Sequence, residues 1–198
     1  MNGLVGMAEA VETREPPEPV RLADLIVAVG TARFSARLFE LLRRCCGADF
    51  CAMYVFDTRR ARCMGAVGRR GVEAGQPQAL QYVSDPFWGR DPSLRARPGF
   101  VVRMRPEQLA DHEYRDAIYR PNDIADRLVV WQPSGGLRYG ISALRTTRHG
   151  EFSEAESAGF EQLAPELAAA LATHDRLGAP PGAGAALLTS LPLIEARL

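Results

Sequence analysis

The sequence predicts an α+β fold in which one mostly antiparallel sheet lies between two layers of helices and loops. Two observations lead to this prediction. Apolar residues recur at three- and four-residue steps toward both ends of the chain, which is the pattern of amphipathic helices. Between those ends, short apolar runs follow one another across tight turns, and such turns join antiparallel strands. We expect the terminal helices to cover one face of the sheet, and the connecting segments 81–100 and 107–125 to cover the other face over a pocket.

The amino-terminal region divides into an arm and two helices. Residues 1–19 contain the run EPPEP and little apolar surface to bury, so we expect them to form a disordered arm. A first helical pattern starts near Val20 and stops at Gly30. A second one stops at Gly47, because glycine readily adopts the left-handed conformation that ends helices. The apolar positions of the two helices are Leu22, Leu25, Ile26 and Val29, followed by Phe34, Leu38, Leu41, Leu42 and Cys45.

The run FCAMYVF at 50–56 predicts a strand that is apolar on both sides. Side chains alternate along a strand, so Tyr54 and Phe56 share one face while Met53 and Val55 share the other. A strand with two apolar faces belongs inside a sheet, with other elements packed on each side. Residues 57–60 then predict a turn to a second strand at 62–67.

The remaining elements follow in order along the chain. Residues 68–75 are interpreted as a glycine-rich connector, and GFVVRM at 99–104 predicts another strand. Residues 107–127 read as a helical piece that ends at Pro121 and continues as a loop. Two further strands form a hairpin around 133–136. The last helix, within 151–177, starts with the capping box of Ser153 and Glu156 and has a buried stripe. That stripe consists of Phe160, Leu163, Leu167 and Leu171.

The overall composition argues against several classes of protein. The 24 basic and 24 acidic residues give a net charge of zero, which does not indicate a partner such as nucleic acid or an anionic membrane surface. No apolar run approaches the roughly 20 residues that a membrane span needs. The first residues also lack the basic and apolar regions of a signal peptide. We therefore expect a cytoplasmic protein without a membrane partner.

Aromatic residues are concentrated in the two segments predicted to cover the sheet. Large rings on proline-interrupted backbone leave gaps, and tyrosine and tryptophan each carry a polar atom that needs a partner when buried. Such surroundings are typical of small-molecule sites. The alternative is a second hydrophobic core that binds nothing. The predicted pocket residues are Tyr82, Trp88, Tyr114 and Tyr119 on the covering segments, with Tyr54, Phe56 and Trp131 on the sheet.

Asp91 has two possible roles. An aspartate before proline commonly caps a turn or helix, because its carboxylate accepts a backbone N–H. The same carboxylate would also accept a hydrogen bond from a ligand amide or amine. The sequence leaves both roles open.

The cysteines predict neither a metal site nor catalysis. Cys45 and Cys46 are adjacent, which fits no common zinc spacing, and no histidine lies near them in the sequence. Together with Cys51 and Cys63 they are most simply small buried residues. Among the four, Cys63 alone has a position that leaves an accessible thiol as an alternative. We expect no cofactor, no metal and no enzymatic activity.

Four stretches of the sequence resemble a known family. They are LADLIVAVGTARFSARLFELLRRCCGADFCAMYVFD, YVSDPFWGRDPSL, HEYRDAIYRPNDIADRLVVW and EFSEAESAGFEQLAPELAAALATHDRL. Over residues 20–177 the pattern is similar to GAF-like sensory domains, in the versions fused ahead of a LuxR-type helix-turn-helix. The resemblance implies an antiparallel sheet, terminal helices that dimerise, and a ligand pocket whose occupancy acts on an appended DNA-binding module. The order of Tyr82, Trp88 and Asp91 is also loosely similar to acyl-homoserine-lactone domains, although their fuller motif spacing is not met.

Two functional hypotheses follow. The first is a ligand-sensing regulatory domain of a bacterial transcriptional regulator, active as a homodimer through its terminal helices. Residues 178–198 would then be a linker toward a DNA-binding module that is not within this sequence, in which no basic recognition helix is visible. A truncated sensory portion is favoured over a stand-alone sensor. The alternative is a dimerisation module without a ligand, built on the apolar stripes of 20–46 and 153–177.

Overall fold

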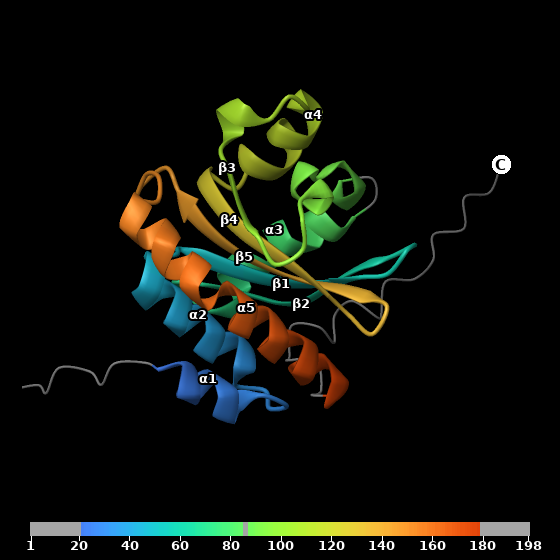
Figure 1. Ribbon diagram of the computed structural model, residues 1–198. Coiled ribbons are helices and arrows are strands. Elements are labelled where there is room, and N and C mark those ends of the chain that lie inside the picture. Colours follow the sequence, from blue (N-terminus) through green and yellow to red (C-terminus); the bar gives the residue numbers. More distant parts are fainter. Residues whose placement is uncertain (1–20, 85–86, 179–198) are drawn as a thin grey trace, which may run out of the picture.

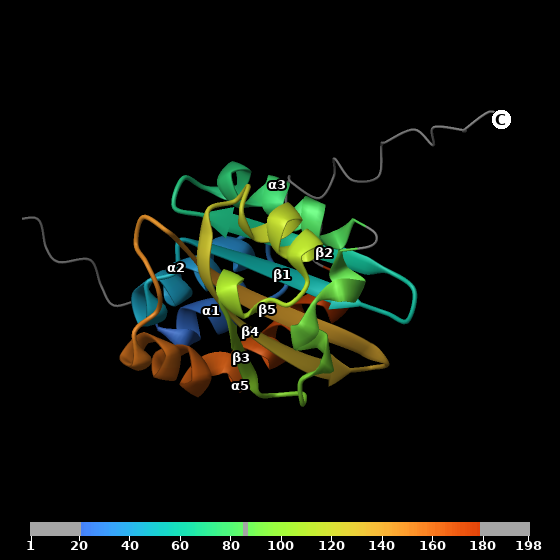
Figure 2. The same cartoon turned by 90° about the horizontal axis from the view of Figure 1, so that it is seen from above.

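The computed structural model describes residues 21–84 and 87–178. The predicted arm at 1–19 lies outside these ranges, and so does the predicted linker, apart from Gly178. Figure 1 shows a central sheet with one group of helices below it and a second group of shorter helical segments above it. Seen from above in Figure 2, the second group lies across the sheet, and the first group lies on its far side. The predicted α+β layering is therefore confirmed.

Within the described residues the sheet has five strands in the order β2-β1-β5-β4-β3, and every neighbouring pair is antiparallel. The central strand β5 pairs with β1 on one side and β4 on the other. This order places β1, the strand that the sequence predicted to be buried on both faces, between β2 and β5. The strands are β1 Phe50–Phe56, β2 Ala61–Gly68, β3 Val101–Met104, β4 Ile124–Ser134 and β5 Leu137–Thr146.

Both tight turns form where the sequence predicts them. Between β1 and β2, an Asp57 carboxylate oxygen accepts the backbone N–H groups of Arg59 and Arg60 at 2.6 and 2.7 Å. Between β4 and β5, Gly135 and Gly136 have φ angles of 60° and 80°. Two positive φ angles in a row are what a two-residue hairpin turn of the favoured twist requires, and glycine adopts them without steric cost.

The terminal helices α1 (Leu22–Ala28), α2 (Phe34–Cys46) and α5 (Glu154–Arg176) cover one face of the sheet (Figure 1). Gly47 ends α2 in the left-handed conformation, and Ser153 with Glu156 forms the predicted capping box of α5. Their buried residues join one face of the sheet in a first hydrophobic core. Ile26 is an exception, because it was assigned to the apolar face of α1 but is 59% exposed.

The opposite layer differs from the prediction in two places. Helix α3 (Val72–Val83) begins inside the segment 68–75 that was expected to be a connector. Gly75 and Pro77 are poor helix formers, so helix propensity does not predict α3. The predicted helical piece at 107–127 is broken into η3 (Pro106–Gln108), α4 (His112–Tyr114) and the π-helix η4 (Arg115–Tyr119), and its last residues already belong to β4. Two further 3-10 turns, η1 (Trp88–Arg90) and η2 (Pro92–Arg95), complete the layer.

Alternation along the strands divides the interior into two cores. On β1, Met53 and Val55 face the terminal helices, whereas Tyr54 and Phe56 face α3 and the short helical segments. On β4, Val130 faces the first group and Trp131 the second. Both faces are buried, as predicted for β1.

In the ranges that the structure describes, no helix combines the length and the apolar content needed to cross a lipid bilayer.

Trp131 in the second core depends on the absence of a side chain at Gly140, its partner on β5. A Cβ atom built at Gly140 would lie 1.7 Å from the nearest atom of the Trp131 ring. We expect Gly140→Ala to lower the free energy of unfolding by about 2 to 3 kcal/mol and to shift the tryptophan emission, because the indole must leave its place. Urea denaturation followed by fluorescence measures both effects.

Gly89→Ala is the matched control. Gly89 has no heavy atom within 4 Å of an added Cβ, so this substitution should change stability by no more than about 0.5 kcal/mol. Equal effects of the two substitutions would contradict the packing of Trp131 against Gly140.

Candidate functional site

The second core brings all the predicted pocket residues into one region between the sheet and the layer of short helices. Apart from Trp88, which is half-buried, each of them is at most 4% exposed. We call the seven rings of this region the aromatic cluster. Its members are Tyr54 and Phe56 on β1, Trp131 on β4, Tyr82 on α3, Trp88 on η1, Tyr114 on α4 and Tyr119 on η4.

The rings of the aromatic cluster contact one another in tilted and edge-on pairs. The centroids of Tyr54 and Tyr82 are 4.7 Å apart, and those of Phe56 and Trp131 are 5.0 Å apart in an edge-on arrangement. Such geometries are the favourable ones for aromatic pairs. The cluster is therefore a hydrophobic core in its own right, and its binding of a ligand stays a prediction.

Asp91 lies at the centre of this core, and its carboxylate is fully occupied. One oxygen accepts the Tyr82 hydroxyl at 2.6 Å and Arg127 Nη1 at 2.8 Å. The other accepts the backbone N–H and the hydroxyl of Ser93, at 2.8 and 2.6 Å. The bond from the Ser93 N–H caps η2, so the capping role of Asp91 is confirmed. The same carboxylate also forms a buried ion pair.

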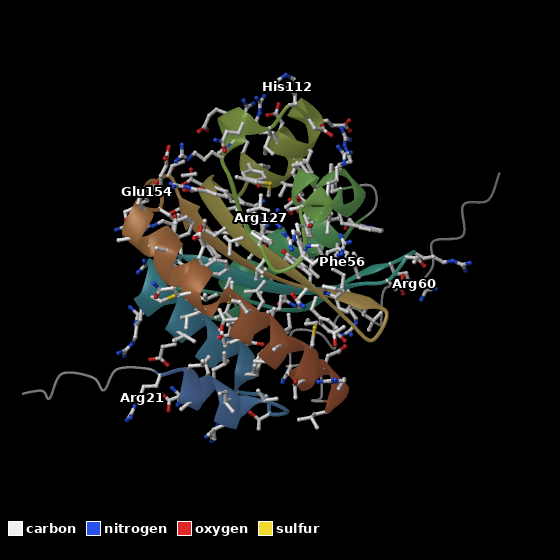
Figure 3. The ribbon with its side chains drawn as sticks, viewed as in Figure 1. Arg21, Phe56, Arg60, His112, Arg127 and Glu154 are labelled. Atoms are coloured by element: carbon white, nitrogen blue, oxygen red, sulfur yellow. The ribbon has the colours of Figure 1, made fainter. Side chains whose placement is uncertain are left out.

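The partner in that ion pair is Arg127, which the sequence analysis did not single out. It lies on β4, and Figure 3 shows its side chain between the sheet and the layer above it. Its side chain donates from Nε to the Ser142 hydroxyl at 3.0 Å and from Nη1 to the Tyr114 hydroxyl at 3.3 Å. We call Arg127 and Asp91 together the ionic centre. The strand IADRLVVW contains the signal for it, because Arg127 has the same parity as Trp131 and must share its buried face.

Trp131 is tied to the ionic centre through Ser93. Its indole N–H donates to the Ser93 hydroxyl at 2.9 Å, and that hydroxyl in turn donates to Asp91. This chain satisfies the polar atom of a tryptophan that is only 1% exposed. It also fixes the position of η2 over the sheet, because Ser93 lies on η2 and Trp131 lies on β4.

Both members of the ionic centre are charged at neutral pH. Burial alone would raise the pKa of Asp91, but the Arg127 charge and the hydrogen bonds from Ser93 and Tyr82 outweigh burial and lower it. Burial opposes the charged form of Arg127, yet the Asp91 charge raises the Arg127 pKa well above its usual value. Burial raises the pKa of Tyr54, Tyr82 and Tyr114 well above that of a free tyrosine. The buried centre therefore has one positive and one negative charge, and neutral tyrosines.

Two polar atoms next to the ionic centre are buried without a hydrogen-bond partner among the described residues. They are Nη2 of Arg127 and the hydroxyl of Tyr119. Burial raises the pKa of Tyr119, and Arg127 opposes that rise both through its charge and as a nearby donor, so the two groups are close although their geometry is not that of a hydrogen bond. A buried polar atom without a partner costs about 1 to 3 kcal/mol.

Clefts open at two ends of the aromatic cluster. One, with a volume of about 390 Å³, is lined by Phe56 and Trp88 together with residues of the β4–β5 hairpin. Another, of about 400 Å³, is lined by Tyr119, Ile124 and charged residues such as Arg115 and Asp116. We call the second one the Tyr119 cleft. Rings of the cluster thus form part of the surface of both clefts.

An ion pair on the outer side of the layer over the ionic centre joins two segments of that layer. Arg90 of η1 donates from Nε and Nη2 to the two carboxylate oxygens of Asp111 at 2.7 and 2.6 Å, and from Nη1 to Glu113 at 2.8 Å. This bidentate pair joins the segment that carries Asp91 to the segment that carries Tyr114 and Tyr119.

The four cysteines lie on α2, β1 and β2. Cys46, Cys51 and Cys63 are buried, and Cys45 is half-buried. The expected burial of Cys63 is confirmed, because it faces the second core at 7% exposure, and the accessible alternative is wrong. Burial raises the pKa of Cys63 to about 11. Within the described part of the chain, no group of three or more His, Cys, Asp or Glu residues is placed to hold a metal ion.

Comparisons with known proteins identify the fold. No family model and no curated protein matches the sequence. Among solved structures, the LBD domain of VqsR from Pseudomonas aeruginosa is 16% identical, with a TM-score of 0.56 over 79% of this chain and 94% of that one. CepR2 from Burkholderia cenocepacia, an N-acylhomoserine-lactone-dependent LuxR-family transcription factor, is 12% identical, with a TM-score of 0.54 over 84% and 93%.

A GAF domain/HD domain protein from Geobacter sulfurreducens is 19% identical, with a TM-score of 0.51 over 80% of this chain and 98% of that one. The chain therefore has the GAF-like fold that the sequence resemblance implied, a fold that also occurs in LuxR-type regulators. At these identities the likeness concerns the fold alone.

The ionic centre gives a prediction for stability. Asp91→Asn leaves the Arg127 charge buried without a counter-charge, so we expect it to lower the free energy of unfolding by about 3 kcal/mol or more at pH 7. Urea denaturation at fixed pH measures the change. Arg120→Gln is the control, because the Arg120–Asp116 pair is exposed and contributes at most about 1 kcal/mol.

The native chain and the Asp91→Asn variant should also differ in how their stability responds to acid. The pKa of Asp91 is lowered in the folded state, so its contribution to stability is complete above the unfolded pKa of about 3.9 and is lost as the pH falls further. Stability of the native chain should thus decline more steeply below about pH 4 than that of Asp91→Asn. Parallel curves would mean that Asp91 is not an ionised partner of Arg127.

Proposed function

We propose that this chain is the ligand-sensing domain of a bacterial transcriptional regulator, and that it binds a small molecule within the aromatic cluster around Arg127 and Asp91. The observation that carries the proposal is the ionic centre itself. An apolar core of the same volume would be as stable or more stable than a buried ion pair, so a charge pair among seven aromatic rings is poorly explained by stability alone. Aromatic walls with a few converging polar groups are the usual lining of small-molecule sites.

The covering layer has the properties of an element that can admit a ligand. It consists largely of short 3-10, α- and π-helical turns, whose packing on the sheet depends on individual side chains. π-Helical turns are often found at functional sites. The Arg90–Asp111 pair closes this layer from outside, so its separation would release the segments that carry Asp91 and Tyr119 from each other.

A continuous series of contacts joins the aromatic cluster to α5. Trp131 packs against Gly140, and the next residue on β5, Tyr139, faces the terminal helices. The Tyr139 hydroxyl donates to Asp175 near the end of α5 at 2.9 Å, and Arg62 of β2 pairs with the same carboxylate. A ligand that prefers one position of Trp131 would therefore shift the population of α5 positions. In the full regulator this difference would act on an appended helix-turn-helix.

The proposed sensor works as a cytoplasmic homodimer through its terminal helices. Ile26 and Val27 on α1 are 59% and 81% exposed, and Leu177 is 63% exposed after α5. Leu177 packs beside Gly30, and His174 accepts the Gly30 N–H at 3.0 Å, so these three apolar side chains belong to one region of the surface. A dimerisation module without a ligand is the second candidate function, and the same exposed patch supports it.

Ligand binding distinguishes the two candidates. In a metabolite library, we expect at least one small neutral compound to raise the melting temperature and to change the emission of Trp131, since binding to the folded state alone stabilises it. The Trp88→Phe variant leaves Trp131 as the only tryptophan, so any change in its emission can be assigned to Trp131. If no compound in a broad library changes either quantity, the sensor function is wrong and the dimerisation module is left.

The exposed patch gives a prediction for self-association. Val27→Glu places a charge in the proposed interface, so we expect it to weaken dimerisation at least tenfold in sedimentation velocity runs over a concentration series. Phe100→Glu is the matched control, because Phe100 is 56% exposed at the start of β3, on a different element. An equal effect of both substitutions, or a monomer throughout the series, would exclude this interface.

A further inference from the structure

We propose that the ligand of this domain is a neutral molecule with a carbonyl-type acceptor oxygen, which Arg127 Nη2 and the Tyr119 hydroxyl bind together. This inference rests on the proposed function and adds the chemical class of the ligand and the residues that recognise it. Neither the capping of turns nor the stability of the second core requires these two donors.

The donors of Arg127 are used unequally. Nε and Nη1 are occupied by Ser142, Asp91 and Tyr114, whereas Nη2 donates to no described residue although Arg127 is only 3% exposed. Tyr119 is 1% exposed and its hydroxyl is likewise without a partner. One carbonyl oxygen has two lone pairs and can accept from both groups at once. Two neighbouring buried donors therefore select a ligand that carries an acceptor.

The charges of the ionic centre select a neutral ligand. Arg127 already has its counter-charge in Asp91, at 2.8 Å. A carboxylate ligand would place a second negative charge beside Asp91, whereas the arginines of the Tyr119 cleft, Arg115 and Arg120, are already paired with Asp116. A buried uncompensated charge is costly. A cationic ligand finds no free acceptor there either, because four hydrogen bonds occupy the two oxygens of Asp91.

The Tyr119 cleft provides the approach to these donors. Tyr119 is part of its lining and ends the π-helix η4, while Ile124 on the adjacent wall begins β4, the strand of Arg127. A displacement of η4 would open the cleft toward Arg127 Nη2. Because rings surround the donors, the body of the ligand that carries the carbonyl should be compact and apolar or aromatic.

Four probes with the same aromatic body test the class of ligand. Acetophenone carries a neutral acceptor, benzoate an anion, benzylamine a cation at pH 7, and ethylbenzene no polar group. Ligand-observed NMR titrations on the intact chain should show acetophenone binding at least tenfold more tightly than benzoate and benzylamine, and more tightly than ethylbenzene. Benzoate or ethylbenzene binding as tightly as acetophenone would overturn the inference, but would leave the proposed function intact, since the aromatic cluster would still bind a ligand.

The Tyr119→Phe variant tests the residue. It removes a hydroxyl that makes no hydrogen bond, so the melting temperature should be unchanged or higher, while acetophenone should bind about three- to tenfold more weakly and ethylbenzene equally well. Thr31→Val removes a hydroxyl between α1 and α2, on the other face of the sheet, which donates to the Ala28 carbonyl, and should leave acetophenone binding unchanged.

Unaltered acetophenone binding in Tyr119→Phe would overturn the inference, because Arg127 and Tyr119 would then hold no more than a water molecule. Failure of all four probes to bind at millimolar concentration would overturn the inference and count against the proposed function as well. The pattern across the probes thus separates an incorrect ligand class from an absent site.

Discussion

The arrangement of the second core depends on one constraint, which is that a guanidinium and a carboxylate are buried together among aromatic rings. Separating two such charges from water costs several kcal/mol for each ion, so every surrounding group has to compensate. Tyr82, Ser93 and Tyr114 each direct a hydroxyl at the pair. Tyrosine suits this position because its ring fills apolar space while its hydroxyl reaches the charge. The aromatic composition of the core and its ionic centre are therefore two aspects of the same requirement.

The sheet separates this polar core from an apolar one. Alternation along the strands gives the terminal helices an interior made mostly of aliphatic residues and phenylalanines, with Tyr139. The opposite layer receives the other four tyrosines, both tryptophans and the ion pair. The first core contains the two longest helices, α2 and α5. The second depends on a few specific hydrogen bonds between short turns and the sheet. In the proposed sensor, the first core would keep the domain folded while the second core responds to the ligand.

The regular elements could be predicted from sequence because their signals are local. A continuous apolar run identified β1, consecutive glycines identified the β4–β5 turn, and Ser153 with Glu156 identified the start of α5. Helix α3 was missed because Gly75 and Pro77 oppose it locally and its packing on the sheet outweighs them. The rings of the candidate site were found by their concentration in two segments. Their connection through Arg127 was not found, because its pairing with Asp91 spans 36 residues and follows from the tertiary fold.

The two ion pairs that hold the covering layer differ in their access to solvent, and this difference makes them respond differently to ionic strength. Arg90 and Asp111 have side chains that are 27% and 35% exposed, whereas those of Arg127 and Asp91 are 4% and 0% exposed. Dissolved ions screen charges that they can approach and have little effect on charges within a dry interior. Added salt should therefore weaken the attraction between Arg90 and Asp111 while that between Arg127 and Asp91 persists, so only the outer pair is sensitive to ionic strength.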